Sequence, residues 1–187
     1  MTESGYSLGA FIEDLRGVIQ AEAGEAGILA RVGPLVRRIA EELGWLSAAM
    51  YEADPVLGYG TTMLHVEPDH GLFVVVDSWL PGRGVPPHDH DTWAVVVGLE
   101  GVERNLFWQR SGDVSQSGHV ELQCINEQQI WPGEVLLMPA GTIHSVLNET
   151  QGTSLSLHVY GRHLNYTDRR QFDLQNKCEL PFRINPR

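Results

Sequence analysis

Apolar residues recur every three or four positions in the first part of the chain, from Ser7 to about Met50. This spacing is typical of amphipathic helices, whose apolar side chains share one face. Ser7 is a residue type favoured at helix N-caps, and Gly33 and Pro34 are residue types that interrupt helices. The pattern predicts an N-terminal helical layer, broken near Gly33 and Pro34, with the apolar positions Leu8, Phe11, Ile12, Leu15, Ile19, Leu35, Ile39, Leu43 and Leu46.

The pattern then changes to short runs rich in β-branched and aromatic residues, separated by Gly, Pro, Asp and Asn. Strands at such spacing, with turn residues between them, predict a sandwich or a barrel. We expect a single domain with helices over residues 1–55, a β-barrel over 56–164 and a C-terminal tail over 165–187 packed on the barrel. The predicted strands lie within residues 72–80, 92–101, 102–109, 119–125, 133–139 and 153–161.

Composition narrows the classes of partner. The 187 residues suit one domain of ordinary size, and the formal net charge is −11. An acidic chain of this kind is a poor binder of nucleic acid or of anionic membranes, because both require positive charge. The chain shows no signal-peptide pattern, no membrane-spanning apolar stretch and no CxxC pair, so we expect a cytoplasmic protein with reduced thiols. The sequence leaves the oligomeric state open, a homo-oligomer included.

Two histidines one residue apart are the first candidate for chemistry. Side chains alternate along a strand, so His88 and His90 point to one face and are able to share a metal ion. An HxH pair alone is equally compatible with two histidines that make ordinary hydrogen bonds. The surrounding sequence therefore has to decide between these interpretations.

Two longer patterns favour the metal. Residues 82–101 follow the first cupin motif, except that Ala94 or Val95 occupies the place of its glutamate. Residues 133–148 match the second cupin motif at every fixed position, namely Gly133, Pro139, Gly141, His144 and Asn148. The chain thus resembles the cupins, which implies a mainly β fold, a double-stranded β-helix (jelly-roll) barrel. The same resemblance implies three metal ligands, His88, His90 and His144.

The absent glutamate has a chemical consequence. Three neutral imidazoles leave a divalent ion with its full +2 charge, which suits an anionic substrate bound directly to the metal. Three protein ligands also leave coordination positions open, as in catalytic rather than structural sites. Imidazole ligands accept iron, zinc, nickel and copper, so the ligand set alone does not identify the metal.

A second group of polar residues lies in the run "TSLSLHVYG". Ser156, His158 and Tyr160 alternate, so all three face one side of the predicted strand and are able to form a hydroxyl–imidazole–phenol chain. The alternative is an edge strand whose polar residues face solvent.

Together with "PPHDHDTW" and "GTIHSVLN", this SxHxY pattern is similar to the thiol dioxygenases, the cysteine and 3-mercaptopropionate dioxygenase group. The runs "HVYG" and "DRRQFD" resemble the bacterial members. The resemblance implies Fe²⁺ at the three histidines, with a small-molecule thiol and O₂ as substrates and a sulfinic acid as product. It also implies that Tyr160 hydrogen-bonds the bound oxygen or the substrate, oriented by His158 and Ser156.

The main departure from that family concerns the residue that binds the substrate's tail group. Cysteine dioxygenases use an arginine before the HxH and 3-mercaptopropionate enzymes a glutamine, and an ungapped count places Thr62 there. A threonine cannot make the bidentate contact that an arginine makes. Arg169, whose place in "DRRQFD" resembles that of an arginine in bacterial enzymes, Arg104 and Arg162 are further candidates, and a solvent-exposed position is the expectation for each.

Two other functions stay open at this point. One is a different three-histidine cupin enzyme, such as a dioxygenase that cleaves a diketone carbon–carbon bond through its enolate. The other is a cupin that binds a metal or small ligand without catalysis. The Ser-His-Tyr pattern disfavours this last function, because simple binding does not require an oriented proton donor beside an open metal position.

Overall fold

The computed structural model describes residues 5–112 and 119–187. Residues 1–4 of the predicted helical range and 113–118 of the predicted barrel range lie outside these segments. Two helices and two 3-10 turns come first, α1 (Leu8–Ala21), α2 (Glu25–Ala40), η1 (Leu43–Trp45) and η2 (Ala48–Tyr51). The strands are β1 (Tyr59–Val66), β2 (Phe73–Trp79), β3 (Gly84–His88), β4 (Ala94–Glu100), β5 (Glu103–Ser111), β6 (Glu121–Ile130), β7 (Val135–Met138), β8 (Ile143–Leu147), β9 (Ser154–Tyr160), β10 (Arg170–Asp173) and β11 (Cys178–Pro181), with η3 (Leu164–Tyr166) after β9.

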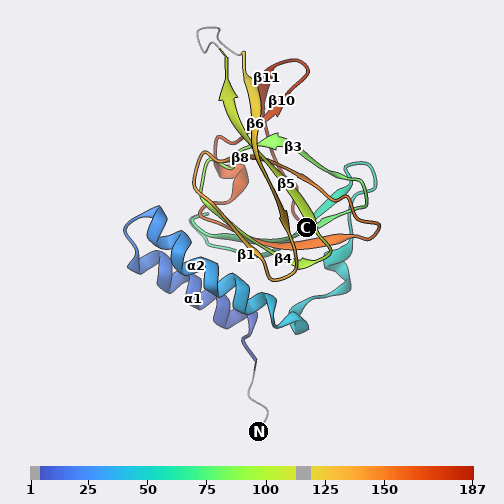
Figure 1. Ribbon diagram of the computed structural model, residues 1–187. Coiled ribbons are helices and arrows are strands. Elements are labelled where there is room, and N and C mark those ends of the chain that lie inside the picture. The colour runs from blue at the N-terminus through green and yellow to red at the C-terminus, as the bar shows by residue number, and fades with distance from the viewer. Residues whose placement is uncertain (1–4, 113–118) are drawn as a thin grey trace.

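The strands form two antiparallel sheets that face each other. The first has the order β1-β2-β9-β4-β7, and the second has the order β11-β10-β3-β8-β5-β6. Helices α1 and α2 lie together on one side of the barrel, and the β5–β6 hairpin extends away from them (Figure 1). The predicted mainly β fold, a cupin double-stranded β-helix barrel with an N-terminal helical layer, is confirmed.

The central strands of the first sheet, β2, β9 and β4, are buried on both faces, and this arrangement positions the polar residues of β9. On the outer face, Leu155, Leu157 and Val159 pack with the apolar side of the helices in one core. Each fully buried aliphatic side chain of this kind contributes about 1.5–3 kcal/mol. Since side chains alternate, Ser156, His158 and Tyr160 must then point into the barrel. The predicted inward orientation therefore holds, and the alternative of an edge strand does not apply, because β9 lies between β2 and β4.

Helix α1 begins as predicted, because the side chain of Ser7 accepts a hydrogen bond from the backbone N–H of Ala10. The predicted interruption at Gly33 and Pro34 is wrong, because α2 continues through both residues. Pro34 is exposed, and its cost is one missing backbone hydrogen bond together with the crowding of its ring against the preceding turn. Gly33 is buried and lets α2 approach Leu137 of β7, which a Cβ atom at this position would meet at 3.3 Å.

Several strands have little sequence signal of their own. Strand β3 contains Pro86 and Pro87, which are tolerated because its pairing with β8 is irregular between Val85 and His88. The tail is more regular than expected, since β10 and β11 form a hairpin that pairs with β3 through Gln171.

Neither α1 nor α2 has the length and apolar composition that crossing a bilayer requires, and the same holds for the other described helical segments.

Candidate metal centre

Three buried histidines meet inside the barrel. His88 is the last residue of β3, and His144 of β8 is its direct partner in the second sheet. His90 lies two residues after His88, just beyond the strand, and not on it as the sequence suggested. The Nε2 atom of His90 lies 3.2 Å from Nε2 of His88 and 3.2 Å from Nε2 of His144. The fold therefore brings one nitrogen of each imidazole to a common point.

The other ring nitrogens explain this orientation. His144 donates from Nδ1 to the side-chain oxygen of Asn105 at 2.9 Å, and His88 donates from Nδ1 to the backbone oxygen of Pro86 at 2.9 Å. A neutral imidazole with a proton on Nδ1 presents a lone pair at Nε2. Such contacts to carbonyl oxygens are typical of metal-binding histidines, because they set the tautomer and the ring orientation.

The residues of this cluster fit a divalent metal ion. Burial lowers the pKa of His144 to about 3 and holds the pKa values of His88 and His90 well below the ordinary value. All three rings are therefore neutral near pH 7, and their converging nitrogens suit a cation bound between them. Two nitrogens bound about 2.1 Å from one ion at tetrahedral or right angles lie about 3.0–3.4 Å apart, which includes the observed separation.

A hydrogen-bonded chain from β9 runs toward the histidine cluster. Ser156 Oγ lies 2.7 Å from His158 Nε2, and His158 Nδ1 lies 2.9 Å from the Tyr160 hydroxyl. The ring of Tyr160 packs edge-to-face against His90, with 5.0 Å between the ring centroids. Burial raises the pKa of Tyr160 well above its usual value, so the phenol keeps its proton. We call Ser156, His158 and Tyr160 the relay.

Arg169 lies in the wall of the same pocket and does not have the solvent-exposed position expected for it. It is 2% exposed and donates from Nε to the backbone oxygen of Asp89 at 3.2 Å. Its guanidinium carbon lies 4.2 Å from the centre of the Phe182 ring. The Nη1 atom is buried and has no hydrogen-bond partner among the described residues. A buried guanidinium with a free N–H group is costly, and an anionic ligand would satisfy it.

The other substrate-binding candidates lie elsewhere. Thr62 is not among the residues that line the pocket, because it pairs with Val76 on the helix-facing side of the first sheet. Its neighbour Thr61 lines the pocket instead, because successive residues of a strand face opposite sides of the sheet. Arg162 is exposed and donates to the backbone oxygen of Tyr166.

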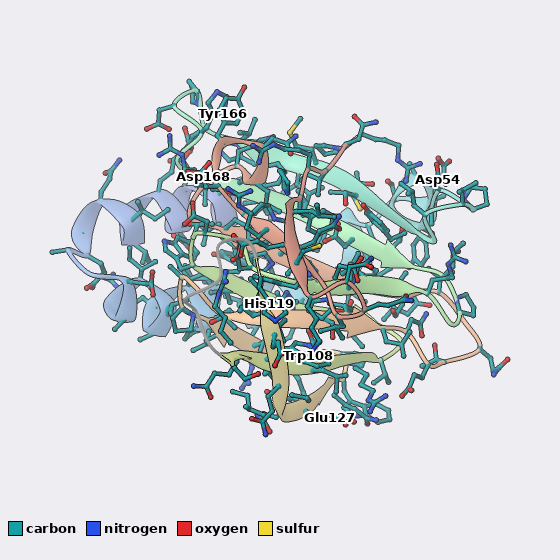
Figure 2. All side chains as sticks on the ribbon, turned by 90° about the horizontal axis from the view of Figure 1, so that it is seen from above. Asp54, Trp108, His119, Glu127, Tyr166 and Asp168 are labelled. Carbon is teal, nitrogen blue, oxygen red and sulfur yellow. The ribbon has the colours of Figure 1, made fainter. Side chains whose placement is uncertain are left out.

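The Arg104 side chain is held by ion pairs on the outside of the barrel. It forms ion pairs with Glu127 and Glu149 at 2.8 and 3.1 Å. In Figure 2, Glu127 lies at the outer edge of the molecule, on the opposite side of the view from Tyr166 and Asp168. Arg162 therefore has the exposed position that the sequence suggested, Arg104 is half-buried with its ion pairs on the outside of the barrel, and Arg169 is buried.

Three buried polar residues near the site were not singled out from the sequence. Asp77 lines the pocket and accepts a hydrogen bond from Thr61 at 2.6 Å. Burial raises the pKa of Asp77 to about 6 and that of Glu103 to about 7. Asp77 interrupts the apolar run "FVVVDSW", and such an acidic residue in a strand buried on both faces is a usable signal. Asn105 has no comparable signal, because its role depends on a contact across the sheet.

The comparisons with known proteins show distant similarity. No protein-family model matches the chain. An oxalate oxidase in complex with the substrate analogue glycolate is 18% identical, over 63% of this chain and 59% of its own, with a TM-score of 0.46. A Klebsiella pneumoniae protein with a double-stranded β-helix domain is 13% identical, over 70% of this chain and 97% of its own, with a TM-score of 0.47. A cupin-superfamily protein from Desulfitobacterium hafniense is 19% identical, over 55% of this chain and 75% of its own, with a TM-score of 0.40.

The alignment spans only about three-fifths of the oxalate oxidase chain. Because these TM-scores are all below 0.5, the fold assignment rests on the strand order and on the two histidine-containing motifs. The chain has a cupin-type barrel with a buried three-histidine cluster that could hold a metal ion.

Proposed function

We propose that the protein is an iron-dependent thiol dioxygenase that converts a small mercapto-acid and O₂ into the corresponding sulfinic acid. The reaction RSH + O₂ → RSO₂H is balanced, because both oxygen atoms join the sulfur and the proton of the thiol is retained. Fe²⁺ held by His88, His90 and His144 would supply the electronic chemistry that brings O₂ and a thiolate to react.

One observation carries this proposal. The three histidines, the relay residues His158 and Tyr160, and the buried Arg169 line a single pocket. A metal-binding cluster alone fits many cupins, and a buried arginine alone fits any anionic ligand. Together they suit a substrate with one end for the metal and a negatively charged group at the other end.

Arg169 is the group that would bind the carboxylate. Its Nη1 atom is buried without a partner, whereas Nε and the face of the guanidinium are already held by Asp89 and Phe182. The side chain is thus fixed in place, while the two N–H groups of Nη1 have no partner among the described residues. A carboxylate oxygen accepts such a charge-assisted hydrogen bond, which also removes the cost of the unpaired buried group. An arginine from the C-terminal tail would then do what the arginine or glutamine before the HxH does in the family that the chain resembles.

The relay would orient the substrate. Tyr160 lies beside His90 and keeps a neutral phenol, and His158 holds the phenol oxygen at 2.9 Å. A phenol in a fixed position makes a directed hydrogen bond with a bound substrate at no further cost in ordering. Apolar side chains complete the walls and limit the access of water to the reacting groups, among them Val75, Val85, Val146, Leu164 and Ile184.

The test measures O₂ uptake and sulfinate formation by protein loaded anaerobically with Fe²⁺. The substrates are 3-mercaptopropionate, cysteine, cysteamine, mercaptosuccinate and acetylacetone, and His144→Ala is the metal-site control. We expect sulfinate from a carboxylate-bearing thiol, one equivalent per O₂, and none from the control. Uptake with acetylacetone alone would indicate a diketone-cleaving enzyme, and a metal-loaded protein inactive with every compound would indicate a binding protein. Both of these results would overturn the proposal.

A further inference from the structure

A buried carboxyl group faces the relay from the side opposite to Tyr160. Asp77 Oδ2 lies 3.5 Å from His158 Nε2, and its other oxygen accepts the hydroxyl of Thr61 at 2.6 Å. The hydroxyl oxygen of Ser156 lies 2.7 Å from the same imidazole nitrogen. His158 Nε2 therefore faces two oxygen atoms, while Nδ1 faces the phenol oxygen of Tyr160 at 2.9 Å.

The position of one proton decides how this chain of contacts works. Burial lowers the pKa of His158 to about 3, so the ring is neutral and carries its proton on either Nδ1 or Nε2. Asp77 is ionised above about pH 6, where its oxygens accept hydrogen bonds and cannot donate them. A carboxylate 3.5 Å away attracts an N–H group and repels a nitrogen lone pair, and this preference is strong in a buried setting.

Ser156 is able to accept the same proton. Ser156 lowers the pKa of the Glu103 carboxyl group, which offers the hydroxyl proton of Ser156 an acceptor on that side. A serine hydroxyl has a single proton to donate. When that proton points toward Glu103, the oxygen of Ser156 is left to accept from His158 Nε2.

We propose that Asp77 is a positioning residue that fixes His158 in the Nε2–H tautomer. In this tautomer Nδ1 accepts the O–H group of Tyr160, and the phenol oxygen presents its lone pairs to the pocket. Tyr160 would then act as an acceptor, suited to an N–H group of Arg169 or of a substrate. This consequence for catalysis rests on the proposed function, but the tautomer itself does not.

The test is a long-range ¹H–¹⁵N correlation spectrum of the full chain labelled with ¹⁵N-histidine. Zinc occupies the histidine cluster as a diamagnetic ion, and the measurement is made at pH 8, where Asp77 is ionised. The signals of His158 are identified by their loss in His158→Asn. We expect the protonated shift at Nε2 and the unprotonated shift at Nδ1. A proton on Nδ1 in the unsubstituted protein would overturn the proposal without any variant of Asp77.

Asp77→Asn tests the cause. The amide oxygen is able to keep the bond from Thr61, so the NH₂ group faces His158 Nε2 and donates to it. We expect the tautomer to invert to Nδ1–H, as happens when the aspartate of a Ser-His-Asp triad becomes asparagine. Glu103→Gln is the matched control, because it removes the charge of a buried carboxyl group that does not contact His158, while its amide oxygen is still able to accept the Ser156 proton, and it should retain Nε2–H.

An Nε2–H tautomer that persists in folded Asp77→Asn would contradict the proposal. If Asp77→Asn does not fold, Thr61→Val provides the second test, since it frees the carboxylate from its hydroxyl partner and should retain Nε2–H. Loss of that tautomer in Thr61→Val would show that the charge of Asp77 is not sufficient. A result in favour of the tautomer, together with no thiol oxidation, would overturn the proposed function alone.

Discussion

His144 directs its Nδ1 atom at the side-chain oxygen of Asn105, 2.9 Å away, and both residues are completely enclosed by the barrel. Strand β5 carries Asn105, and its neighbour β8 carries His144, so the contact crosses the second sheet. The hydrogen bond places the proton of His144 on Nδ1 and leaves Nε2 free for a metal ion. Asn105 is therefore part of the metal centre, although it is not a ligand.

Asn105→Ala should weaken metal binding about 10- to 100-fold, because losing such an outer contact frees the orientation and tautomer of the ligand. The measurement is the affinity for Zn²⁺ or Fe²⁺ in competition with a chelator. Asn126→Ala, an exposed asparagine on β6, is the matched control and should bind metal like the unsubstituted protein. Equal affinity in the two variants would contradict the role given to Asn105.

Arg169→Lys should raise the KM for 3-mercaptopropionate about 10- to 100-fold, which corresponds to the loss of about 1.5–3 kcal/mol from a hydrogen bond to a charged group. Lysine keeps the charge but lacks the planar fork that holds Asp89 and stacks on Phe182. Propanethiol has no carboxylate, so its kinetics should change little.

Arg104→Lys is the matched control for this experiment, since its ion pairs with Glu127 and Glu149 lie outside the barrel. It should leave the kinetics of both thiols unchanged. Equal losses for 3-mercaptopropionate and propanethiol in Arg169→Lys would show that Arg169 maintains the pocket and does not read the carboxylate.

Glu103 makes stability depend on pH. Burial raises the pKa of its carboxyl group from 4.5 to about 7, so between these values the folded state binds more protons than the unfolded state. The contribution of Glu103 to the free energy of unfolding is therefore largest below pH 4.5 and falls as pH rises toward 7.

Glu103→Gln should remove this dependence. Relative to the unsubstituted protein, the variant should gain on the order of 3 kcal/mol in free energy of unfolding between pH 4.5 and pH 8, measured by urea denaturation. Glu127→Gln is the control, because Glu127 is exposed and Arg104 lowers its pKa. A constant difference between Glu103→Gln and the unsubstituted protein at all pH values would contradict the buried-charge explanation.

Pro34→Ala should stabilise the protein by about 1–2 kcal/mol. The substitution restores an N–H group inside α2 and removes the ring clash with the preceding turn, worth up to about 3 kcal/mol. A more flexible unfolded chain offsets part of this gain, by about 0.4–1 kcal/mol. Arg31→Ala, at another exposed position of α2, should have a smaller effect. A loss of stability in Pro34→Ala would show that the proline ring contributes to packing against β7.

The patterns that predicted correctly were those with a local physical cause. Apolar spacing found both helices, since their buried faces are periodic, and β-branched runs found β2, β4 and β9, which are buried on both sides. Strand β3 was missed because its prolines resemble a loop, and its place in the sheet depends on pairing with β8 and β10.

The residues of the candidate site also divide into those that a local sequence pattern identifies and those whose place depends on contacts between distant parts of the chain. The fixed spacing of two motifs brought out His88, His90 and His144, and alternation along one strand brought out the relay. Thr62 faces the helices and Thr61 faces the pocket, and the sequence count alone could not show which of the two faces of the strand is inside. The burial of Arg169 could not be predicted, since it depends on Phe182 of the tail, which lies over its guanidinium group.

The central claim is that both atoms of O₂ are added to the sulfur of a mercapto-acid at the three-histidine centre. The most direct measurement is the mass of the product that iron-loaded protein forms from 3-mercaptopropionate under ¹⁸O₂ in unlabelled water. We expect a sulfinic acid that carries two ¹⁸O atoms, and no product from His144→Ala. A product with one ¹⁸O atom or none, or a disulfide in place of the sulfinic acid, would contradict the dioxygenase function.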